Sequence, residues 1–415
     1  MPDIISNLPH NVIDVILIRM PCKDAVRTSV LSKKWRYHWC RRTELTLDES
    51  LWNREDLNPT VRFREIINQI LTIHEGPITK FTLDIVHLKR SPEIDNFILF
   101  LRNHIQDLVL HLPLGIQYTV PSTLFTCSQL RHLNLYFCSI YHPSAFEGFD
   151  KLISLELCGV STSSELLESL ISHCPLLEKL EMSILEDLDM IEINAPMLKL
   201  FTFSGDISSI CLKNVPRLVE ASLIGDIEQT ESLDFAKIFE SCSALEQLSL
   251  NFLNSEFIAE EGYRVPRRLP VNLNNVRRFD VPDILLVESY KLSYIICLLR
   301  SFPNLEYLEL QVVDEDDSDT DEDEEFTEES LQPETLSDLT FNHLVEFQLG
   351  SFKGGTSEMQ FIKHLLANSP VLEIMVINQQ FLDEEPLDTR EKIFNEISNF
   401  PRASPKAEIV YKDFS

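Results

Sequence analysis

Glycine is scarce in this chain, with 10 residues in 415. The sequence contains no glycine-rich phosphate loop, no G-x-S-x-G nucleophile turn and no His-Glu-x-x-His zinc motif. The 11 histidines and 9 cysteines are scattered, with no Cys-x-x-Cys spacing that would indicate zinc ligands. We therefore expect no catalytic residues, no metal site and no cofactor, so the chain is predicted not to be an enzyme.

Long apolar runs are also missing. No stretch of eighteen apolar residues occurs, so we expect no membrane span. Asp3 and Asn7 interrupt the region where a signal peptide needs an unbroken apolar stretch. Several of the cysteines, such as Cys138 and Cys174, occupy apolar positions, which indicates buried free thiols in a reducing compartment. The predicted location is the cytoplasm, the nucleus or both.

Acidic residues dominate the charge. The chain has 66 Asp and Glu against 36 Lys and Arg, a net charge of −30. A run at 314–329 holds twelve acids in sixteen residues, and such self-repulsion predicts a disordered loop. A solvated loop is the plainer interpretation of this run, and a tether for a basic partner is the functional one. Nucleic-acid binding is disfavoured because it needs a basic stripe.

The first forty-two residues predict three short helices. Pro9 suits a first helical turn, and an apolar stripe of α-helical spacing follows it. So few residues cannot bury all their apolar surface alone, so part of it must meet the rest of the chain or a partner. The residues that mark the three helices are Val12, Ile13, Ile16, Leu17 and Met20, then Val26 and Val30, then Trp35 and Trp39.

The same segment is basic. Residues 22–42 hold seven Lys or Arg and one Asp, a net charge of +6 on an acidic chain. This contrast favours an acidic partner, with charge assisting the encounter. An ordinary amphipathic cap on a larger domain is the alternative that the pattern alone leaves open.

Residues 4–36 resemble an F-box in the order and spacing of their motifs, Ile4-Ile5-Ser6-Asn7-Leu8-Pro9 and Ser32-Lys33-Lys34-Trp35-Arg36 among them. The resemblance implies a docking module that binds a Skp-type adaptor protein and, through it, a cullin. Carried over position by position, it implies adaptor contacts by Leu8, Pro9, Val12, Ile16, Leu17, Pro21, Val30 and Trp35.

From about residue 78 the chain repeats an L-x-x-L-x-L pattern that resembles leucine-rich repeats. A longer block of helix, break and strand recurs around Cys174, Cys242, Phe302 and Ser369. Stacking such units buries a continuous core that no single unit could bury. Copies of the pattern start at Ile78, Ile105, Leu130, Leu152, Leu177, Leu198, Leu218, Leu245, Val276, Leu305, Leu344 and Leu372.

Residues 343–377 and 400–410 resemble the FBD domain of plant F-box proteins. The whole chain therefore resembles a plant F-box/FBD/leucine-rich-repeat protein. The predicted fold is α/β: a three-helix F-box at 1–42, a linker or cap at 43–77, and an irregular solenoid at 78–333. The solenoid has parallel strands on its concave side and helices outside. FBD-like repeats at 334–412 complete the prediction.

The x positions beside the second Leu of each repeat are expected to point to the concave face. Across eight repeats they hold five acids and two bases, so a basic or lysine-bearing segment of an unknown substrate protein is predicted to dock there. Solvated positions with no ligand are the alternative. The substrate-binding candidates are Glu156, Lys179, Glu181, Arg278, Tyr307 and Glu309.

The resemblance implies a substrate-recognition subunit of a Skp–cullin–F-box ubiquitin ligase, which holds a target near a conjugating enzyme supplied elsewhere. The rival interpretation is an F-box scaffold that binds the adaptor or transcription partners without ligase turnover.

Overall fold

The computed structural model describes residues 8–33, 35–51, 59–86, 94–113, 118–141, 146–184, 189–225, 235–252, 265–271, 273–284, 286, 290–312, 331, 333–378 and 387–412. The chain divides into two compact units, Met1–Met197 and Leu198–Ser415. The acidic run at 314–329 predicted to be disordered lies outside the described residues. Among the residues that are described, no helix combines the length and the apolar character that crossing a membrane requires.

Two α-helices open the N-terminal unit, α1 (His10–Ile18) and α2 (Cys22–Arg27). Pro9 precedes α1 and Pro21 precedes α2, where a missing N–H costs nothing. The predicted third α-helix is replaced by short 3₁₀ turns, η1 (Thr28–Val30), η2 (Trp35–Tyr37) and η3 (Trp39–Arg41). Trp35 and Trp39 in these turns are buried, and 3₁₀ turns of this kind occur in short pieces.

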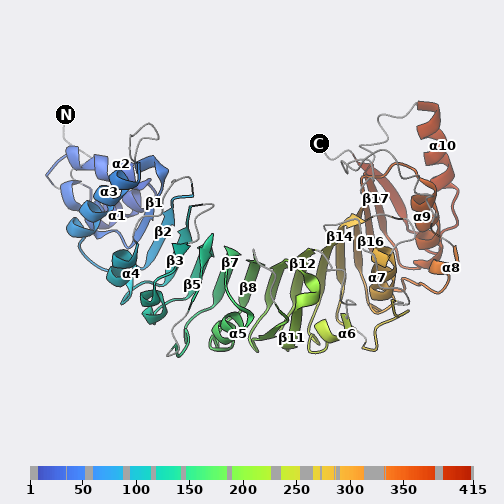
Figure 1. The fold of residues 1–415 in the computed structure, drawn as a ribbon. Helices are drawn as coiled ribbons and strands as arrows, with labels where there is room; N and C mark the ends of the chain where they lie inside the picture. The colour runs from blue at the N-terminus through green and yellow to red at the C-terminus, as the bar shows by residue number, and fades with distance from the viewer. Residues whose placement is uncertain are drawn as a thin grey trace, which may run out of the picture. The chain divides into compact units, whose positions relative to one another are not determined.

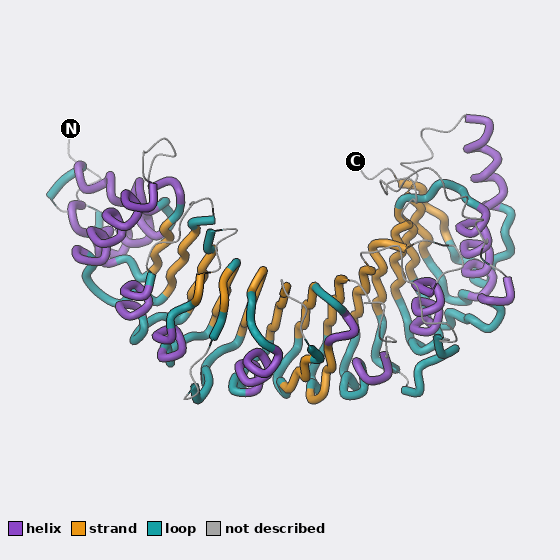
Figure 2. The backbone as a smooth tube through the Cα atoms, in the orientation of Figure 1, coloured by secondary structure: helices purple, strands orange, loops and turns teal. Residues whose placement is uncertain are grey.

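The sheet of the N-terminal unit is wholly parallel, in the order β1-β2-β3-β5-β7-β8. Figure 1 shows α4 and α5 on the same side of this sheet, and Figure 2 shows its strands side by side. The strands are β1 (Glu44–Leu47), β2 (Lys80–Asp84), β3 (Asp107–His111), β5 (His132–Tyr136), β7 (Ser154–Val160) and β8 (Lys179–Ile184). The other elements are η4 (Glu49–Leu51), α3 (Pro59–Ile73), α4 (Asp95–Leu101), β4 (Tyr118–Thr119), η5 (Ser122–Thr126), β6 (Cys138–Ser139), α5 (Ser164–Ser172) and β9 (Ile191–Asn194).

The C-terminal unit repeats the arrangement, with parallel strands in the order β10-β12-β13-β14-β15-β16-β17-β18. The strands are β10 (Leu200–Ser204), β12 (Glu220–Gly225), β13 (Gln247–Phe252), β14 (Arg278–Ile284), β15 (Tyr307–Val312), β16 (Glu346–Gly350), β17 (Ile374–Asn378) and β18 (Glu408–Lys412). The other elements are η6 (Ile207–Ser209), β11 (Ile210–Asn214), α6 (Phe235–Ile238), α7 (Tyr290–Leu299), α8 (Pro333–Leu336), α9 (Thr356–Asn368) and α10 (Leu387–Ser398).

Each copy of the predicted repeat starts two residues before a strand. The copy at Leu130 precedes β5, for example, and the copy at Leu372 precedes β17. The leucines of the pattern point into the core, as Leu133 and Leu135 do at 1% exposure each, because side chains alternate across a strand. Strands β1 and β18 of the large sheets form where no full copy of the pattern occurs, and β1 lies inside the predicted linker. The short strands β4, β6, β9 and β11 also lie outside the pattern.

The recurring block has a local cause. At its break, the side chains of Cys174, Cys242 and Ser369 each donate to the carbonyl four residues earlier, at the end of the preceding helix. These three residues are at most 2% exposed, so the bond satisfies a polar group inside the core. All nine cysteines are free and seven are buried, as predicted; Cys158 and Cys211 are half-buried.

Candidate docking surfaces

Helix α1 is apolar on two sides. Ile13 and Leu17, one turn apart, are 0% exposed and form its inner side. Val12 and Ile16 are also one turn apart, yet each is 37% exposed, and Val15 is 55% exposed. A helix at a protein surface normally has one apolar stripe, which faces the core. The outer side of α1 is therefore apolar surface that the described fold leaves uncovered.

The turn after α2 adds to this surface. Val30 is 87% exposed and Leu31 is 52% exposed, although both are large aliphatic residues. Pro9 and Pro21 are exposed, and Leu8 is half-buried. We call the following residues the exposed apolar set: Val12, Val15, Ile16, Ile18, Val30 and Leu31.

Two of the predicted adaptor contacts do not belong to this surface. Leu17 is 0% exposed and Trp35 is 2% exposed, so the expectation that they present bare apolar surface is wrong. Leu17 lies on the inner side of α1, and the 3₁₀ turn at η2 places Trp35 inside the fold. Both side chains stabilise the N-terminal helices, and the remaining predicted contacts are the ones available to another protein.

Polar residues that the sequence did not reveal hold α1 in place. His38 is 7% exposed, and its Nδ1 lies 3.3 Å from Asp14 Oδ1 while its Nε2 lies 3.0 Å from His10 Nδ1. Arg42 donates to the carbonyl of Ile18, the last residue of α1, at 3.2 Å. Partial burial lowers the pKa of Arg42 from its ordinary value. These contacts bring residues 38–42 back against the helix whose outer side is exposed.

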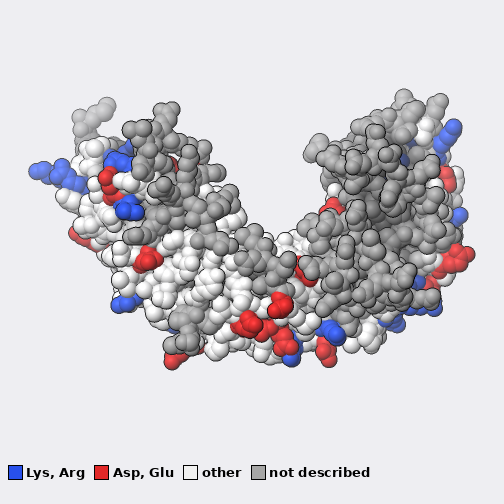
Figure 3. Space-filling view, viewed as in Figure 1, with Lys and Arg blue, Asp and Glu red and all other residues white. Residues whose placement is uncertain are grey.

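Basic side chains lie close in sequence to the exposed apolar set. Figure 3 shows Lys and Arg on the surface of this end of the N-terminal unit. Arg27 pairs with Asp24 at 3.2 Å and Arg41 with Glu75 at 3.2 Å. Lys33 and Arg36 are exposed and form no ion pair with any described residue. The surface thus combines uncovered aliphatic groups with positive charge.

The second surface is the face of each sheet opposite the buried leucines, which we call the open face. Strand β7 alternates half-buried Ser154 and Glu156 with buried Leu155 and Leu157, and β5, β13 and β15 begin with the same alternation. The six predicted substrate-binding residues are all half-buried on this face. They separate into two clusters of three, one in each unit.

The cluster of the N-terminal unit surrounds Glu156. Asn134 donates to Glu156 Oε2 at 2.7 Å, and the hydroxyl of Tyr136 donates to Glu156 Oε1. Lys179 pairs with Glu181 at 3.1 Å on the neighbouring strand, where Glu156 and Glu181 are in register. Partial burial raises the pKa of Glu156, and the nearby Glu181 charge raises it further.

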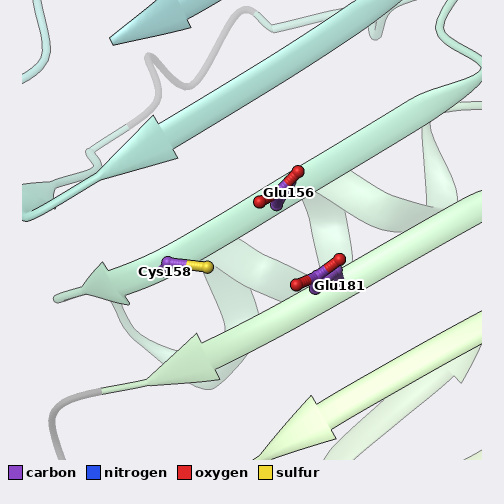
Figure 4. Close-up of side chains that lie close together, drawn as sticks. All are labelled: Glu156, Cys158 and Glu181. Atoms are coloured by element: carbon purple, nitrogen blue, oxygen red, sulfur yellow. The ribbon is translucent and has the colours of Figure 1, made fainter. Parts of the chain in front are cut away.

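Cys158 joins this cluster, as Figure 4 shows. Ligand atoms of Glu156, Cys158 and Glu181 lie within 4.8 Å of one another. Burial, with the two carboxylates, raises the pKa of Cys158 to about 11, which disfavours the thiolate that binds metals. Protein donors already contact both carboxylates. We therefore interpret the group as an internal hydrogen-bond network and assign it no metal.

The cluster of the C-terminal unit is built around Arg278. Its guanidinium lies 3.8 Å from the centre of the Tyr307 ring, donates to Asp280 Oδ2 at 2.8 Å, and donates to Glu309 Oε2 at 3.2 Å. The Tyr307 hydroxyl also donates to Glu309 Oε2, at 2.6 Å. The register of β14 and β15 places Arg278 beside Tyr307 and Asp280 beside Glu309. Sequence reasoning named three of these residues as candidates, and the parallel register brings them together.

Two acceptor atoms on this open face lack donors. Asp280 Oδ1 and Asn251 Oδ1 are shielded from water, and neither accepts a hydrogen bond from any described residue. Burial raises the pKa of Asp280, although Arg278 acts in the opposite direction. Tyr136, Cys158 and Asn251 were missed as site residues. The period of two along each strand places them on the same face as the predicted positions and is the signal that could have found them.

Three family models match the chain. A model of the F-box domain matches residues 5–45, the LRR repeats of FBD-associated F-box protein At5g56370 match residues 97–233, and the LRR domain of At1g61320/AtMIF1 matches residues 179–398. An F-box joined to leucine-rich repeats is the class of protein that the fold and these matches define.

Similar proteins come from Arabidopsis thaliana. F-box/FBD/LRR-repeat protein At1g13570 is 32% identical, and the alignment covers 99% of this chain and 98% of that protein. F-box/FBD/LRR-repeat protein At3g52680 is 26% identical over 99% of this chain and 93% of that protein. F-box/LRR-repeat protein At4g14103 is 32% identical over 49% of this chain and 55% of that protein. This chain belongs to the plant F-box/FBD/LRR-repeat family.

Proposed function

We propose that the chain is a substrate-recognition subunit of a Skp–cullin–F-box ubiquitin ligase. The exposed apolar set carries this proposal. Its six aliphatic side chains are 37% to 87% exposed on one small helical segment. Apolar surface exposed to water is unfavourable, and a group of such side chains is typical of a protein-binding site. A Skp-type adaptor would cover this surface, with Lys33 and Arg36 steering an acidic partner toward it. A cullin would join through the adaptor, in the cytoplasm, the nucleus or both.

In this proposal the chain forms no bond in the target. It holds a target protein on the open face of its sheets, so that a target lysine lies near a conjugating enzyme supplied by the rest of the complex. The proposed target segment is basic. The acids Glu156, Glu181 and Glu309 on the open faces favour a segment of positive charge.

Co-purification tests the proposed binding to an adaptor and a cullin. The full-length protein should co-purify with a Skp-type adaptor and a cullin, and a target should accumulate when residues 8–42 are deleted. Adaptor binding without a cullin, and with no accumulating target, would instead support a scaffold without ligase turnover. Absence of adaptor binding would reject both interpretations.

Charge reversal tests the proposed binding of a basic target segment to the open face. The triple variant Glu156→Lys, Glu181→Lys and Glu309→Lys should weaken binding of a fluorescent oligolysine peptide and reduce its salt dependence. The matched control reverses three exposed acids on or next to helices, Glu240, Glu334 and Glu396, with the same change in net charge. Equal losses in both variants would indicate a general charge effect and would reject the open face as the binding surface.

A further inference from the structure

The last described strand, β18, lies at one end of its sheet. It pairs in parallel with β17 on one side, and no described strand pairs with its other side. Glu408 donates its N–H to the carbonyl of Glu373, toward β17, at 2.9 Å. Because successive residues of a strand direct their N–H and C=O groups to opposite sides, Ile409 and Tyr411 direct theirs to the outer edge. Such an edge is a template for another strand.

The core is also incomplete at β18. In β17 the core-facing residues Met375 and Ile377 are 0% exposed, whereas their register partners Ile409 and Tyr411 in β18 are half-exposed. Strand β1 of the N-terminal unit shows the contrasting case. There α2 packs against the strand, and the core-facing Leu45 and Leu47 are 1% and 0% exposed. The Phe394 ring lies 4.3 Å from that of Tyr411 and leaves it half-exposed.

The sequence of β18 is complementary to itself. The strand reads Glu408-Ile409-Val410-Tyr411-Lys412, with an acid at one end and a base at the other, and both end residues are exposed. If two copies ran antiparallel with Val410 at the centre, Glu408 of each would lie opposite Lys412 of the other, on the open face. Ile409 would lie opposite Tyr411 on the core face, and these two residues carry the outward N–H and C=O groups. Opposite charges, apolar side chains and backbone hydrogen-bonding groups then face one another in a single register.

We propose that β18 is a homodimerisation edge, where a second copy of this chain adds its own β18 antiparallel about a two-fold axis centred on Val410. Such an isologous contact closes on itself and stops at two copies. Apolar and backbone contact areas from one strand pair are small, so the dimer is a reversible one that forms at high micromolar protein. The proposal is independent of the function proposed above, because no F-box or open-face cluster residue takes part in it.

Charge swapping at β18 provides the test. Sedimentation of the full-length protein at low salt should show a monomer–dimer equilibrium. Glu408→Lys or Lys412→Glu alone turns two attractive pairs per dimer into two repulsive ones, and each should raise the dimer dissociation constant by at least about tenfold. The double variant, Glu408→Lys with Lys412→Glu, restores both pairs and should dimerise to within about threefold of the unmodified chain.

The two single variants also test the register when mixed. An equimolar mixture of the Glu408→Lys and Lys412→Glu chains should form heterodimers more tightly than either forms homodimers. Circular dichroism controls for folding, since both side chains are exposed and neither contributes to the core. A chain that stays monomeric at several hundred micromolar overturns the proposal. A dimer that neither single variant weakens, or that the double variant does not restore, overturns it equally.

Discussion

Val30→Ala is the sharpest perturbation of the exposed apolar set. Truncation removes two carbons, each worth about 0.8 kcal/mol when it leaves water, so burial of the whole difference is worth about 1.6 kcal/mol. Val30 is 87% exposed in the described fold, so about 1.4 kcal/mol of that remains to be gained from a partner. A loss of this size is about tenfold in the dissociation constant for a Skp-type adaptor.

The same calculation, transfer free energy times exposed fraction, applies to Val12 and Ile16. Each is 37% exposed, so Val12→Ala forfeits about 0.6 kcal/mol and Ile16→Ala about 0.9 kcal/mol of partner contact. Combined with Val30→Ala, the triple variant should bind about a hundredfold more weakly, if the three contributions add.

Isothermal titration calorimetry with purified adaptor measures these changes. Val30→Ala alone should leave the free energy of unfolding within about 0.5 kcal/mol, because little of Val30 is buried in the free chain. The matched control is Val371→Ala, a valine of the C-terminal unit at 45% exposure, which should leave adaptor binding unchanged. Adaptor affinity unaltered by the triple variant would refute the assignment of this surface, and an equal loss in the control would show that the effect is not specific.

Three further outcomes follow from burial. Trp35→Ala should lower the free energy of unfolding of the N-terminal unit by about 3–5 kcal/mol, and a denaturant titration that shows no loss would contradict the burial of its side chain. Burial raises the pKa of Cys138, Cys174 and Cys242 to about 12, which favours the neutral thiol. Alkylation of these three at pH 8, read by mass spectrometry, should be at least about a hundredfold slower in native than in denatured protein, and equal rates would count against the fold. Gly225→Ala should destabilise the C-terminal unit by about 3 kcal/mol or more, since φ is +150° and a Cβ would lie 1.7 Å from the carbonyl oxygen of Gly205. Thermal melting measures this loss, and the matched control Gly350→Ala, at a glycine without a positive φ, should lose less stability.

The repeats could be predicted from the sequence because each depends on residues close together in the chain. An apolar residue, most often leucine, lies two residues before each strand of the repeats, and alternating apolar residues follow it. This order specifies a strand with one buried side, which neighbouring repeats cover. The pattern did not predict strands β1 and β18, which lie at the ends of the sheets. Such a strand has a repeat on one side only, so it does not need the full pattern.

The amino-acid order by itself determined the class of fold, the family and the twelve strands of the repeats, since periodicity and spacing are properties of neighbouring residues. It could not tell which side of α1 faces inward, because Val12, Ile13, Ile16 and Leu17 are equally apolar. Packing against the 3₁₀ turns made that choice, burying Leu17 and Trp35 and exposing Val12 and Val30. The tertiary structure likewise decided that Arg278, Tyr307 and Glu309 form one cluster, because residues 29 and 31 positions apart meet through parallel register alone.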